Sequence, residues 1–381
     1  MEIIKTVFIG FGYRGKQLLR LLQSIPSYHI VAIADPHVTS FHTNGILCYS
    51  DGYNDYIRML SEQRPHLAII ASPWHCHIEQ THQCLQAGCH VALEIKGGFC
   101  INEYQSVIRL SQEKKLRIYP MENTIFIREN LAVYNLVHAG VLGEIVHMTG
   151  GYRHDLRNLL INSSGEMGNA DSSESVWRSN FYKTENGDLY PTHGLAPLCL
   201  IGDINRKDRI KSLTSFSSKS AGIRQRIREA GGDDNLSISM GDIVSTQLQT
   251  ESGILITLVH DTTLPRPRSL NFEVQGTKGI WQGEQRQIYI EGISPFETWE
   301  SDEPYISEYE HDYWKAWGKE ALHIDQHHKG MDYIMLKAIE AEMKECSTYP
   351  ITIHDLALWT SVSPYSKLSI KEGKSIMLPT E

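Results

Sequence analysis

The sequence predicts an α/β fold: an N-terminal Rossmann-type, doubly wound parallel sheet, followed by an α+β domain with a large, mostly antiparallel, open-faced sheet. Strand and helix patterns alternate from the first residues to about residue 121, as in repeated β–α units. Beyond that point, strand-like runs follow one another with few helices between them, which is typical of an antiparallel sheet. We therefore expect one domain over residues 1–121 and a second over 122–381. Whether the C-terminal helices pack back on the first domain stays open.

The expected elements follow from the periodicity of apolar residues. In the first domain we expect strands at 3–9, 29–34, 67–71, 90–94 and 116–120, and helices at 16–22, 55–60, 77–87 and 102–115. In the second we expect a helix at 130–138, strands at 144–149, 210–217, 242–250, 254–260, 269–276 and 287–291, and final helices at 330–345 and 354–366. Segments 159–175 and 219–235 are predicted to be long loops, either lids or disordered. Segment 296–317, acidic and aromatic, fits a cover over a sugar or a plain surface segment equally well.

The first strand leads into a glycine-rich turn that opens the first helix, Gly10-Phe11-Gly12-Tyr13-Arg14-Gly15. Gly10 permits the tight turn, Gly12 lets the backbone approach a pyrophosphate, and Gly15 lets the helix pack closely on the strand. The anion would then contact the N–H groups at the helix start. The triplet alone is also consistent with a tight turn that binds nothing, so the prediction of a dinucleotide site depends on the second strand.

The second strand ends in Asp35, about twenty residues after the last glycine, where a dinucleotide needs an acceptor for its ribose hydroxyls. Because this carboxylate would repel a 2′-phosphate, and Pro36 and His37 supply no arginine, we expect NAD rather than NADP. Ligands of doubly wound sheets bind at the carboxyl ends of the strands. The predicted NAD-binding residues are Gly10, Gly12, Tyr13, Arg14, Gly15, Asp35, Ser72, Trp74, His77, Glu94, Lys96 and Asn123.

Composition excludes several classes of function. The 381 residues carry a net charge of −9, which disfavours nucleic acid and anionic membranes as partners. The 7 cysteines are scattered without a CxxC pair, so a reducing compartment is expected rather than a disulfide framework. The His and Cys residues between 75 and 90 match no common zinc spacing, and we expect no metal. No apolar run reaches membrane-spanning length, and the first strand leaves no room for a signal peptide, so a cytoplasmic location is expected.

Several motifs resemble the glucose–fructose oxidoreductase and inositol dehydrogenase superfamily. They are the glycine turn, Ala71-Ser72-Pro73 with His77 four residues on, and Ala87-Gly88-Cys89-His90-Val91. The chain departs from the dehydrogenases of that superfamily in two places. It has Glu94-Ile95-Lys96 where they usually have Glu-Lys-Pro, and Leu189 stands where an aspartate would precede His193 by four residues.

A sub-branch fits better, the NAD-dependent glycosidases of glycoside hydrolase family 109. The collinear motifs are Ser72-Pro73-Trp74-His75-Cys76-His77, Glu122-Asn123, the run 151–157, Trp177-Arg178, the run 186–195, the run 203–206, Pro265-Arg266-Pro267, the run 276–279 and the run 328–333. The resemblance covers essentially the whole chain, and those glycosidases also lack the Glu-Lys-Pro lysine. It implies transient oxidation of a small glycoside at C3, removal of the C2 proton, elimination at C1 and recycling of NAD.

The resemblance also implies catalytic residues, namely Tyr152, Arg178, Tyr190, His193, His328 and Glu122. His193 is the candidate base for the C3 hydroxyl, since histidine titrates near neutral pH; it could instead be a structural histidine at a helix start. Tyr152 and Tyr190 are candidates for the C2 base or for stabilising the enolate, and otherwise are buried aromatic residues. Arg178 would favour a phenolate if it lies close, or else pairs with a surface carboxylate. His328 and Glu122 match sugar-binding positions, although His327 could equally be the relevant ring.

One further departure bears on the substrate. Arg268 follows Pro265-Arg266-Pro267, where the family has a tyrosine, and an arginine would suit a substrate bearing a carboxylate, sulfate or phosphate. The alternatives to a glycosidase or lyase are a sugar or polyol dehydrogenase that releases NADH, and a catalytically silent dinucleotide-binding sensor. The partner is expected to be a small sugar or glycoside, with the protein a homodimer or homotetramer.

Overall fold

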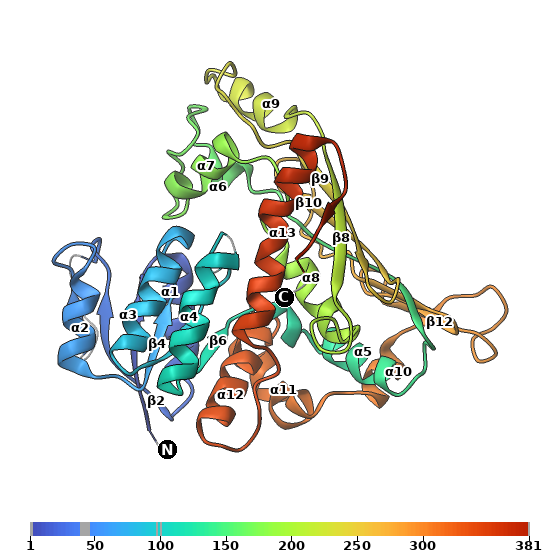
Figure 1. Ribbon diagram of the computed structural model, residues 1–381, viewed down its shortest axis with the longest axis horizontal. Coiled ribbons are helices and arrows are strands. Elements are labelled where there is room, and N and C mark those ends of the chain that lie inside the picture. Colours follow the sequence, from blue (N-terminus) through green and yellow to red (C-terminus); the bar gives the residue numbers. More distant parts are fainter. Residues whose placement is uncertain (1–2, 39–45, 97, 100, 380–381) are drawn as a thin grey trace. The chain divides into compact units, whose positions relative to one another are not determined.

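The computed structural model describes residues 3–38, 46–96, 98–99 and 101–379 (Figure 1). The chain forms two compact units. Unit 1 comprises residues 1–126 and 313–360, and unit 2 comprises residues 127–312 and 361–381. The boundary at residue 121 remains our proposal for the end of the dinucleotide-binding domain. In the described part of the chain, every helix is too short or too polar to cross a membrane.

Unit 1 contains a six-stranded parallel sheet with the order β3-β2-β1-β4-β5-β6. Its strands are β1 (Ile4–Ile9), β2 (Tyr28–Ala34), β3 (Leu47–Tyr49), β4 (Leu67–Ile70), β5 (His90–Leu93) and β6 (Ile118–Pro120). Four of them, β1, β4, β5 and β6, are almost entirely buried, as expected for a parallel sheet covered by helices. The predicted doubly wound fold is therefore confirmed, with β3 as an additional short strand.

The four α-helices that the structure describes before residue 121 lie close to their predicted positions, and two short 3-10 helices, η1 and η2, were not predicted. They are α1 (Tyr13–Leu22), α2 (Asp55–Gln63), η1 (Trp74–Cys76), α3 (His77–Gln86), α4 (Ile101–Lys114) and η2 (Asn123–Phe126). In α1, Leu18, Leu21 and Leu22 are buried, which gives the helix an apolar face.

A segment from late in the chain completes unit 1. It contains α11 (Asp312–Ile324), α12 (Met331–Met343) and the first part of α13 (Ile353–Glu372). Helix α12 packs against α1 and η2. The Tyr28 hydroxyl donates to the Leu336 carbonyl at 2.8 Å, and the Ser27 hydroxyl donates to Glu340. The Rossmann-type sheet is thus held in part by residues more than three hundred positions away.

Unit 2 contains a nine-stranded sheet with the order β14-β13-β12-β11-β7-β10-β9-β8-β15. Its strands are β7 (Ile145–Arg153), β8 (Ile210–Ser217), β9 (Ile243–Thr250), β10 (Leu255–Asp261), β11 (Glu273–Gly276), β12 (Gly279–Gln282), β13 (Gln287–Ile290), β14 (Glu300–Ser301) and β15 (Ile376–Met377). Only β7 and β10 pair in parallel, and the other pairs are antiparallel. The predicted mostly antiparallel sheet is confirmed.

The helices of unit 2 correct two predictions. They are α5 (Arg128–His138), α6 (Arg157–Leu160), α7 (Ser175–Thr184), α8 (Thr192–Ile201), α9 (Gly222–Glu229) and α10 (Glu303–Glu308). The predicted loop at 219–235 contains α9. Segment 296–317, for which no secondary structure was predicted, contains α10 and the start of α11. The final helix was expected to end at 366 but continues to Glu372, through Pro364. Its last turns are held in place because the Ser369 hydroxyl accepts a hydrogen bond from the Ser215 backbone N–H at 2.9 Å.

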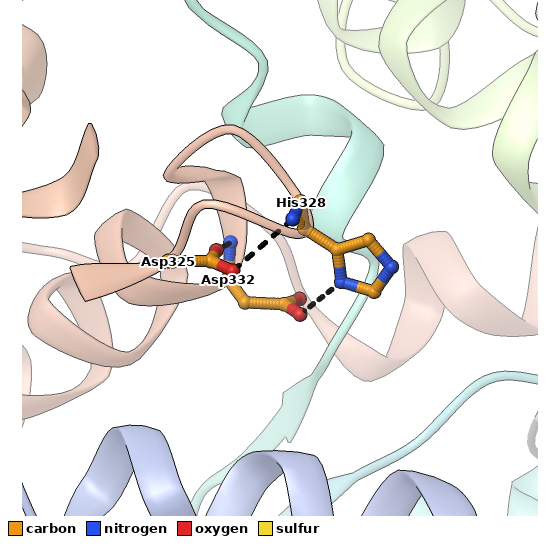
Figure 2. A group of neighbouring side chains, drawn as sticks. All are labelled: Asp325, His328 and Asp332. Atoms are coloured by element: carbon orange, nitrogen blue, oxygen red, sulfur yellow. Dashed lines mark hydrogen bonds and ion pairs between the residues drawn. The ribbon is translucent and has the colours of Figure 1, made fainter. Parts of the chain in front are cut away.

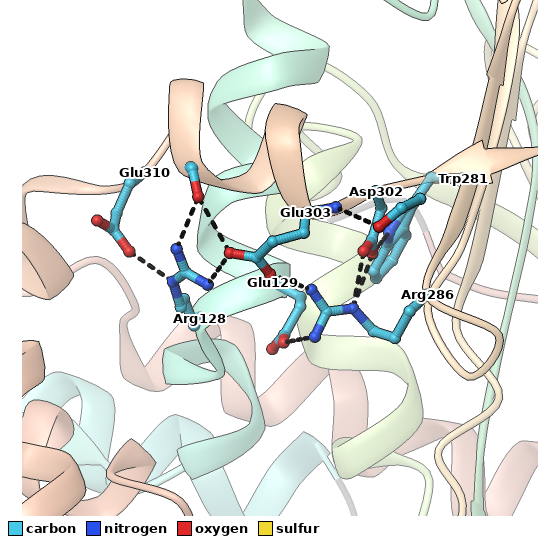
Figure 3. Close-up of polar contacts among 9 residues, drawn as sticks. Arg128, Glu129, Trp281, Arg286, Asp302, Glu303 and Glu310 are labelled. Carbon is cyan, nitrogen blue, oxygen red and sulfur yellow. Dashed lines mark hydrogen bonds and ion pairs between the residues drawn. The ribbon is translucent and has the colours of Figure 1, made fainter.

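A network of ion pairs joins the start of α5, the start of α10 and the turn before β13 (Figure 3). Arg286 bridges Glu129 at 2.6 Å, Asp302 at 2.8 Å and Glu303 at 2.7 Å. Asp302 is fully buried and also accepts a hydrogen bond from the Trp281 indole at 2.9 Å. Because a buried carboxylate needs such partners, Asp302 ties the sheet to α10.

A close glycine contact sets helix α8 against strand β7. A Cβ atom on Gly194 would overlap the backbone of Gly151, and one on Gly150 would overlap the Gly194 carbonyl. Only glycine permits this approach of helix to strand. It places the first turn of α8, with His193, directly beside the end of β7, with Tyr152.

Candidate functional site

The carboxyl ends of the parallel strands in unit 1 are in register, as the sequence predicted. Ile9 pairs with Ala34 and Ile70, Ile70 with Leu93, and Leu93 with Pro120. The candidate NAD-binding residues that follow these strands therefore lie along one edge of the sheet.

The glycine turn has the geometry that a dinucleotide requires. Gly10 has φ +89°, and a Cβ atom there would lie 2.5 Å from the Ser72 backbone nitrogen. A Cβ on Gly15 would lie 2.6 Å from the Gly10 carbonyl oxygen. Gly12 is the N-cap of α1, and no side chain caps this helix start. The turn thus fits the backbone cradle of a pyrophosphate, whose charge the helix dipole favours.

The predicted ribose acceptor lies beside this turn. The Asp35 carboxylate accepts hydrogen bonds from the backbone N–H groups of Phe11 at 2.6 Å and His37 at 2.8 Å. Each of its oxygens has a second lone pair, so the carboxylate keeps the capacity to accept from ribose hydroxyls. These contacts hold Asp35 against the glycine turn, and the residues present fit NAD.

Ser72 and His77 form a small buried group next to Gly10. The Ser72 hydroxyl donates to Gln80 at 2.5 Å, and His77 Nε2 lies 2.7 Å from the Ser72 carbonyl oxygen. Burial lowers the pKa of His77 to about 4, so this imidazole is neutral near pH 7. Both residues support the turn that contacts Gly10.

Arg14 connects the glycine turn to two carboxylates. Its Nε lies 2.6 Å from Glu94 Oε1, and its two terminal nitrogens lie 2.6 and 2.8 Å from the oxygens of Asp332. Asp332 also accepts from the Asn123 amide at 2.8 Å and lies 2.5 Å from His328 Nδ1. Four predicted site residues, Arg14, Glu94, Asn123 and His328, are therefore brought together around Asp332.

Burial and charge act in opposite directions on the two carboxylates. For Asp332, burial raises the pKa, but Arg14 and His328 together lower the pKa by more than burial raises it. The carboxyl therefore remains ionised, with a pKa well below its usual range. For Glu94, burial raises the pKa to about 7, and Arg14 only partly opposes this. Arg14 thus has Asp332 as its permanent counter-ion, while Glu94 titrates near neutral pH.

Figure 2 shows the surroundings of His328. Within the described part of the chain, Asp325, His328 and Asp332 are the His, Cys, Asp and Glu side chains close enough to share a metal ion. The Asp325 carboxylate accepts from the backbone N–H groups of His328 at 3.2 Å and Asp332 at 3.0 Å. Because Asp332 also binds Arg14, a metal cation here would compete with the guanidinium. The hydrogen bonds indicate instead that the three side chains stabilise the start of α12.

The remaining predicted site residues of unit 1 lie in the segments that follow its parallel strands. Glu122 is fully buried and accepts from the Thr124 hydroxyl at 2.7 Å. Lys96 is also buried, with its Nζ 5.9 Å from the ring centre of Trp74. Tyr13 is exposed, and its hydroxyl lies 3.3 Å from Nε2 of His327. Of the two adjacent histidines, His327 therefore contacts the glycine turn helix, and His328 contacts Asp332.

A second group of predicted residues meets in unit 2. The ring centres of Tyr152 and Tyr190 are 4.7 Å apart, those of Tyr190 and His193 are 4.8 Å apart, and those of Tyr152 and His193 are 5.4 Å apart. Tyr190 and His193 are buried. The Arg178 guanidinium lies 5.9 Å from the centre of the Tyr190 ring. Four of the six predicted catalytic residues thus form one cluster.

Arg178 combines two interactions that the sequence left as alternatives. It forms an ion pair with Glu174 at 2.6 Å and also acts on Tyr152. Burial raises the pKa of Tyr152, whereas the positive charges of Arg178 and Arg268 oppose this rise. The Tyr152 hydroxyl therefore remains protonated near pH 7 and is suited to donating a hydrogen bond.

Sequence reasoning missed two residues of these groups. Asp332 lies four residues after His328, a spacing that brings two side chains to one helical face, but its arginine partner is remote in the sequence. His154 lies two residues after Tyr152, and its Nδ1 is 3.4 Å from the Tyr152 hydroxyl. Alternation along a strand places both rings on one face of the sheet, so this pair could have been predicted.

Two family models together match nearly the whole chain. Residues 126–380 match the family described as "Glycosyl hydrolase 109, C-terminal domain", and residues 4–120 match "Oxidoreductase family, NAD-binding Rossmann fold". The chain is 31% identical to a glycosyl hydrolase family 109 protein of Parabacteroides distasonis, covering 97% of this chain and 84% of that protein. It is also 31% identical to an alpha-N-acetylgalactosaminidase of Tannerella forsythia, covering 98% and 85%.

Solved structures share the fold. A levoglucosan dehydrogenase in complex with NADH and levoglucosan matches with a TM-score of 0.72 and 15% identity, over 99% of this chain and 100% of that chain. The myo-inositol 2-dehydrogenase of Lactobacillus plantarum matches with a TM-score of 0.67 and 13% identity, over the same shares. The near full-length sequence matches of this chain, together with its Rossmann-type NAD-binding unit, establish that it is a member of glycosyl hydrolase family 109. This is a family of NAD-dependent, carbohydrate-active enzymes.

Proposed function

We propose that this protein is an NAD-dependent glycosidase that cleaves a small glycoside through transient oxidation at C3. The observation that carries this proposal is the cluster of Tyr152, Tyr190 and His193, with Arg178 beside it. When bound, NAD would supply a hydride acceptor for C3 of the sugar and, once reduced, a hydride donor for the same carbon. The protein itself must move two protons and stabilise one enolate oxygen.

The three side chains suit these tasks in different ways. His193 is a buried imidazole and takes the proton of the C3 hydroxyl. The resulting ketone acidifies the C2 proton. Tyr190 removes this proton as a phenolate, a form that the neighbouring Arg178 favours, while the leaving group departs from C1. Tyr152 donates a hydrogen bond to the enolate oxygen, a role consistent with the raised pKa of its hydroxyl. Water then adds at C1, so the net reaction is hydrolysis without consumption of NAD.

In unit 1, we propose that Asp35, Gly10, Gly12 and Gly15 hold the cofactor and that Arg14 keeps the turn in place. The Arg14 side chain is bound on both sides by Glu94 and Asp332, so its direct task is positioning rather than contact with the cofactor. His328, bonded through Nδ1 to Asp332, keeps Nε2 as the nitrogen for a sugar hydroxyl. We also propose Glu122 and Lys96 as site residues, because both lie just beyond the carboxyl ends of strands in the first sheet.

The decisive experiment follows two products at once. Purified protein with NAD is given aryl glycosides, beginning with an aryl α-N-acetylgalactosaminide because one relative is named for that activity. We expect release of the aglycone without accumulation of NADH, and incorporation of deuterium at C2 when the reaction runs in D₂O. Net formation of NADH would identify a dehydrogenase instead. If neither aglycone nor NADH formed, the result would support a sensor.

A matched pair of histidine variants tests the site. His193→Ala should lower aglycone release by about a hundredfold or more, as loss of a general base usually does. His354, which is exposed at the start of α13, serves as the control, and its replacement by alanine should leave release unchanged. Equal rates for the two variants would refute the assignment of His193.

A further inference from the structure

Positive charge gathers at the end of strand β7, next to the tyrosine–histidine cluster. Arg153 and Ser269 form an antiparallel bridge, with their backbones exchanging hydrogen bonds of 3.1 and 2.8 Å. His154 and Arg268 directly flank this isolated bridge, one on each strand segment, so the bridge holds them close to each other. Tyr152 lies two residues before His154 and so points to the same face as His154. The local pairing therefore brings Arg268 beside His154 and Tyr152.

Among the residues that the structure describes, Arg268 differs from its neighbours in lacking a counter-ion. Arg178 pairs with Glu174 at 2.6 Å, Arg157 with Asp155 at 2.8 Å, and Arg266 with Asp261 at 2.7 Å. Within the described residues, Arg268 makes neither an ion pair nor a hydrogen bond, and it is exposed. Its charge does reach the cluster. Burial raises the pKa of Tyr152 and Arg268 is one of the charges that oppose this rise, whereas burial lowers the pKa of His154 and Arg268 adds to that lowering.

Two carboxylates that contact residues close to Arg268 in the sequence are already engaged. Asp261 is shared, since Arg266 lies 2.7 Å and Arg153 3.9 Å from the same oxygen. Glu284 accepts from the backbone N–H groups of Leu270 and Asn271, each at 2.9 Å. An unpaired guanidinium beside a polar cluster is suited to bidentate recognition of an oxyanion.

We propose that the natural substrate is a glycoside bearing an anionic group, and that Arg268 binds that group. This inference rests on the proposed function, since it names the substrate class of the same site. Sulfate esters, phosphate esters and uronic carboxylates share the chemistry required, namely two coplanar oxygen acceptors with negative charge. Charge-assisted hydrogen bonds of this kind change affinity by roughly ten- to a hundredfold.

A competing role for Arg268 would be to tune Tyr152 electrostatically. That role would affect charged and uncharged substrates alike and would shift the pH profile of turnover. Recognition of an anion instead produces a difference between the two substrates, and that difference shrinks as salt screens the exposed charge.

The test compares kcat/KM on an aryl α-N-acetylgalactosaminide, its 6-sulfate and 6-phosphate esters, and an aryl α-galacturonide. In the wild-type protein we expect at least one anionic probe to exceed the uncharged one by ten- to a hundredfold. Arg268→Gln should remove most of this preference and Arg268→Lys should retain part of it. Arg209→Gln is the matched control, because Arg209 is exposed and precedes β8 at the opposite end of the sheet strands.

A binding measurement separates this inference from the proposed function. Calorimetric titration of the NAD-loaded protein with N-acetylgalactosamine, its 6-sulfate and 6-phosphate, and galacturonic acid requires no turnover. A preference for an anionic sugar that Arg268→Gln removes supports the inference, even if no glycoside is cleaved. Equal affinities in the wild-type protein, or a preference that survives in Arg268→Gln, would overturn it.

Discussion

Replacing Asp332 by asparagine removes a buried negative charge while nearly preserving side-chain volume. Asp332 accepts two hydrogen bonds from Arg14 and one each from Asn123 and His328, and it is 1% exposed. Breaking a buried ion pair by removing one partner costs about 3–5 kcal/mol. Because Arg14 keeps Glu94 as a second partner, we expect a loss near the lower limit, about 3 kcal/mol.

Urea denaturation followed by circular dichroism measures this loss. With a slope of about 3 kcal/mol per molar urea, the midpoint should fall by roughly 1 M. Asp51→Asn is the control, since Asp51 is exposed in the same unit and its replacement should change stability by less than about 0.5 kcal/mol. A loss below about 1 kcal/mol for Asp332→Asn would show that the network around Arg14 contributes little.

The pH dependence supplies a second check on the same variant. The folded pKa of Asp332 lies below its ordinary value of 3.8, so its stabilisation is complete above that pH and is lost as the pH falls. The difference in stability between wild type and Asp332→Asn should therefore narrow below about pH 4. A difference that widened there would contradict the assigned direction.

Three further predictions follow from other contacts. Gly194→Ala inserts a methyl group into the contact with Gly151, so it should cost about 1–3 kcal/mol in thermal unfolding experiments and lower turnover by displacing His193. Asp302→Asn leaves part of a buried ion-pair network unpaired and should lower the urea midpoint by an amount equivalent to roughly 3 kcal/mol. Because burial raises the pKa of Glu94 from 4.5 to about 7, this group stabilises the fold at low pH and loses that contribution as the pH rises to 7. In Glu94→Gln, the free energy of unfolding measured by urea titration should therefore fall less between pH 4.5 and 7 than in the wild type, by up to roughly 3 kcal/mol.

The alternating elements of unit 1 were predictable because each has a strong local signal. Buried parallel strands are continuous apolar runs, and the glycine turn, with Asp35 after the second strand, is a pattern of fixed spacing. The short strands β3, β14 and β15 have two or three residues each, too few for any periodicity to be detected. Their position depends on pairing with neighbours in the sheet.

Helix α9 shows why other elements were missed. Its sequence has only Ile223 and Ile227 as buried side chains beyond its glycine, within a stretch rich in charge. The cap comes from Asp242, whose carboxylate accepts from the N–H groups of Ala221 at 2.5 Å and Gly222 at 2.7 Å. A capping residue twenty positions downstream leaves no local signature of a helix start.

In the candidate site too, some contacts could be predicted from sequence spacing and others depend on the tertiary fold. Tyr190 and His193 share one loop and helix start, so their proximity follows from spacing. Tyr152 joins them only because glycines let α8 lie against β7, which no local pattern reveals. The pairing of Arg14 with Asp332 spans 318 positions and depends on a late segment returning to the first sheet.

That late segment has a consequence for the order in which the protein can fold on the ribosome. When residue 126 has been synthesised, Arg14, Asn123 and Ser27 still lack the partners that α12 will supply. The first sheet therefore lacks these contacts, with Arg14 paired to Glu94 alone, while nearly two hundred residues of unit 2 are made. A truncated protein ending before α12 should consequently depend on chaperones, whereas one that retains residues up to 360 contains every segment of unit 1.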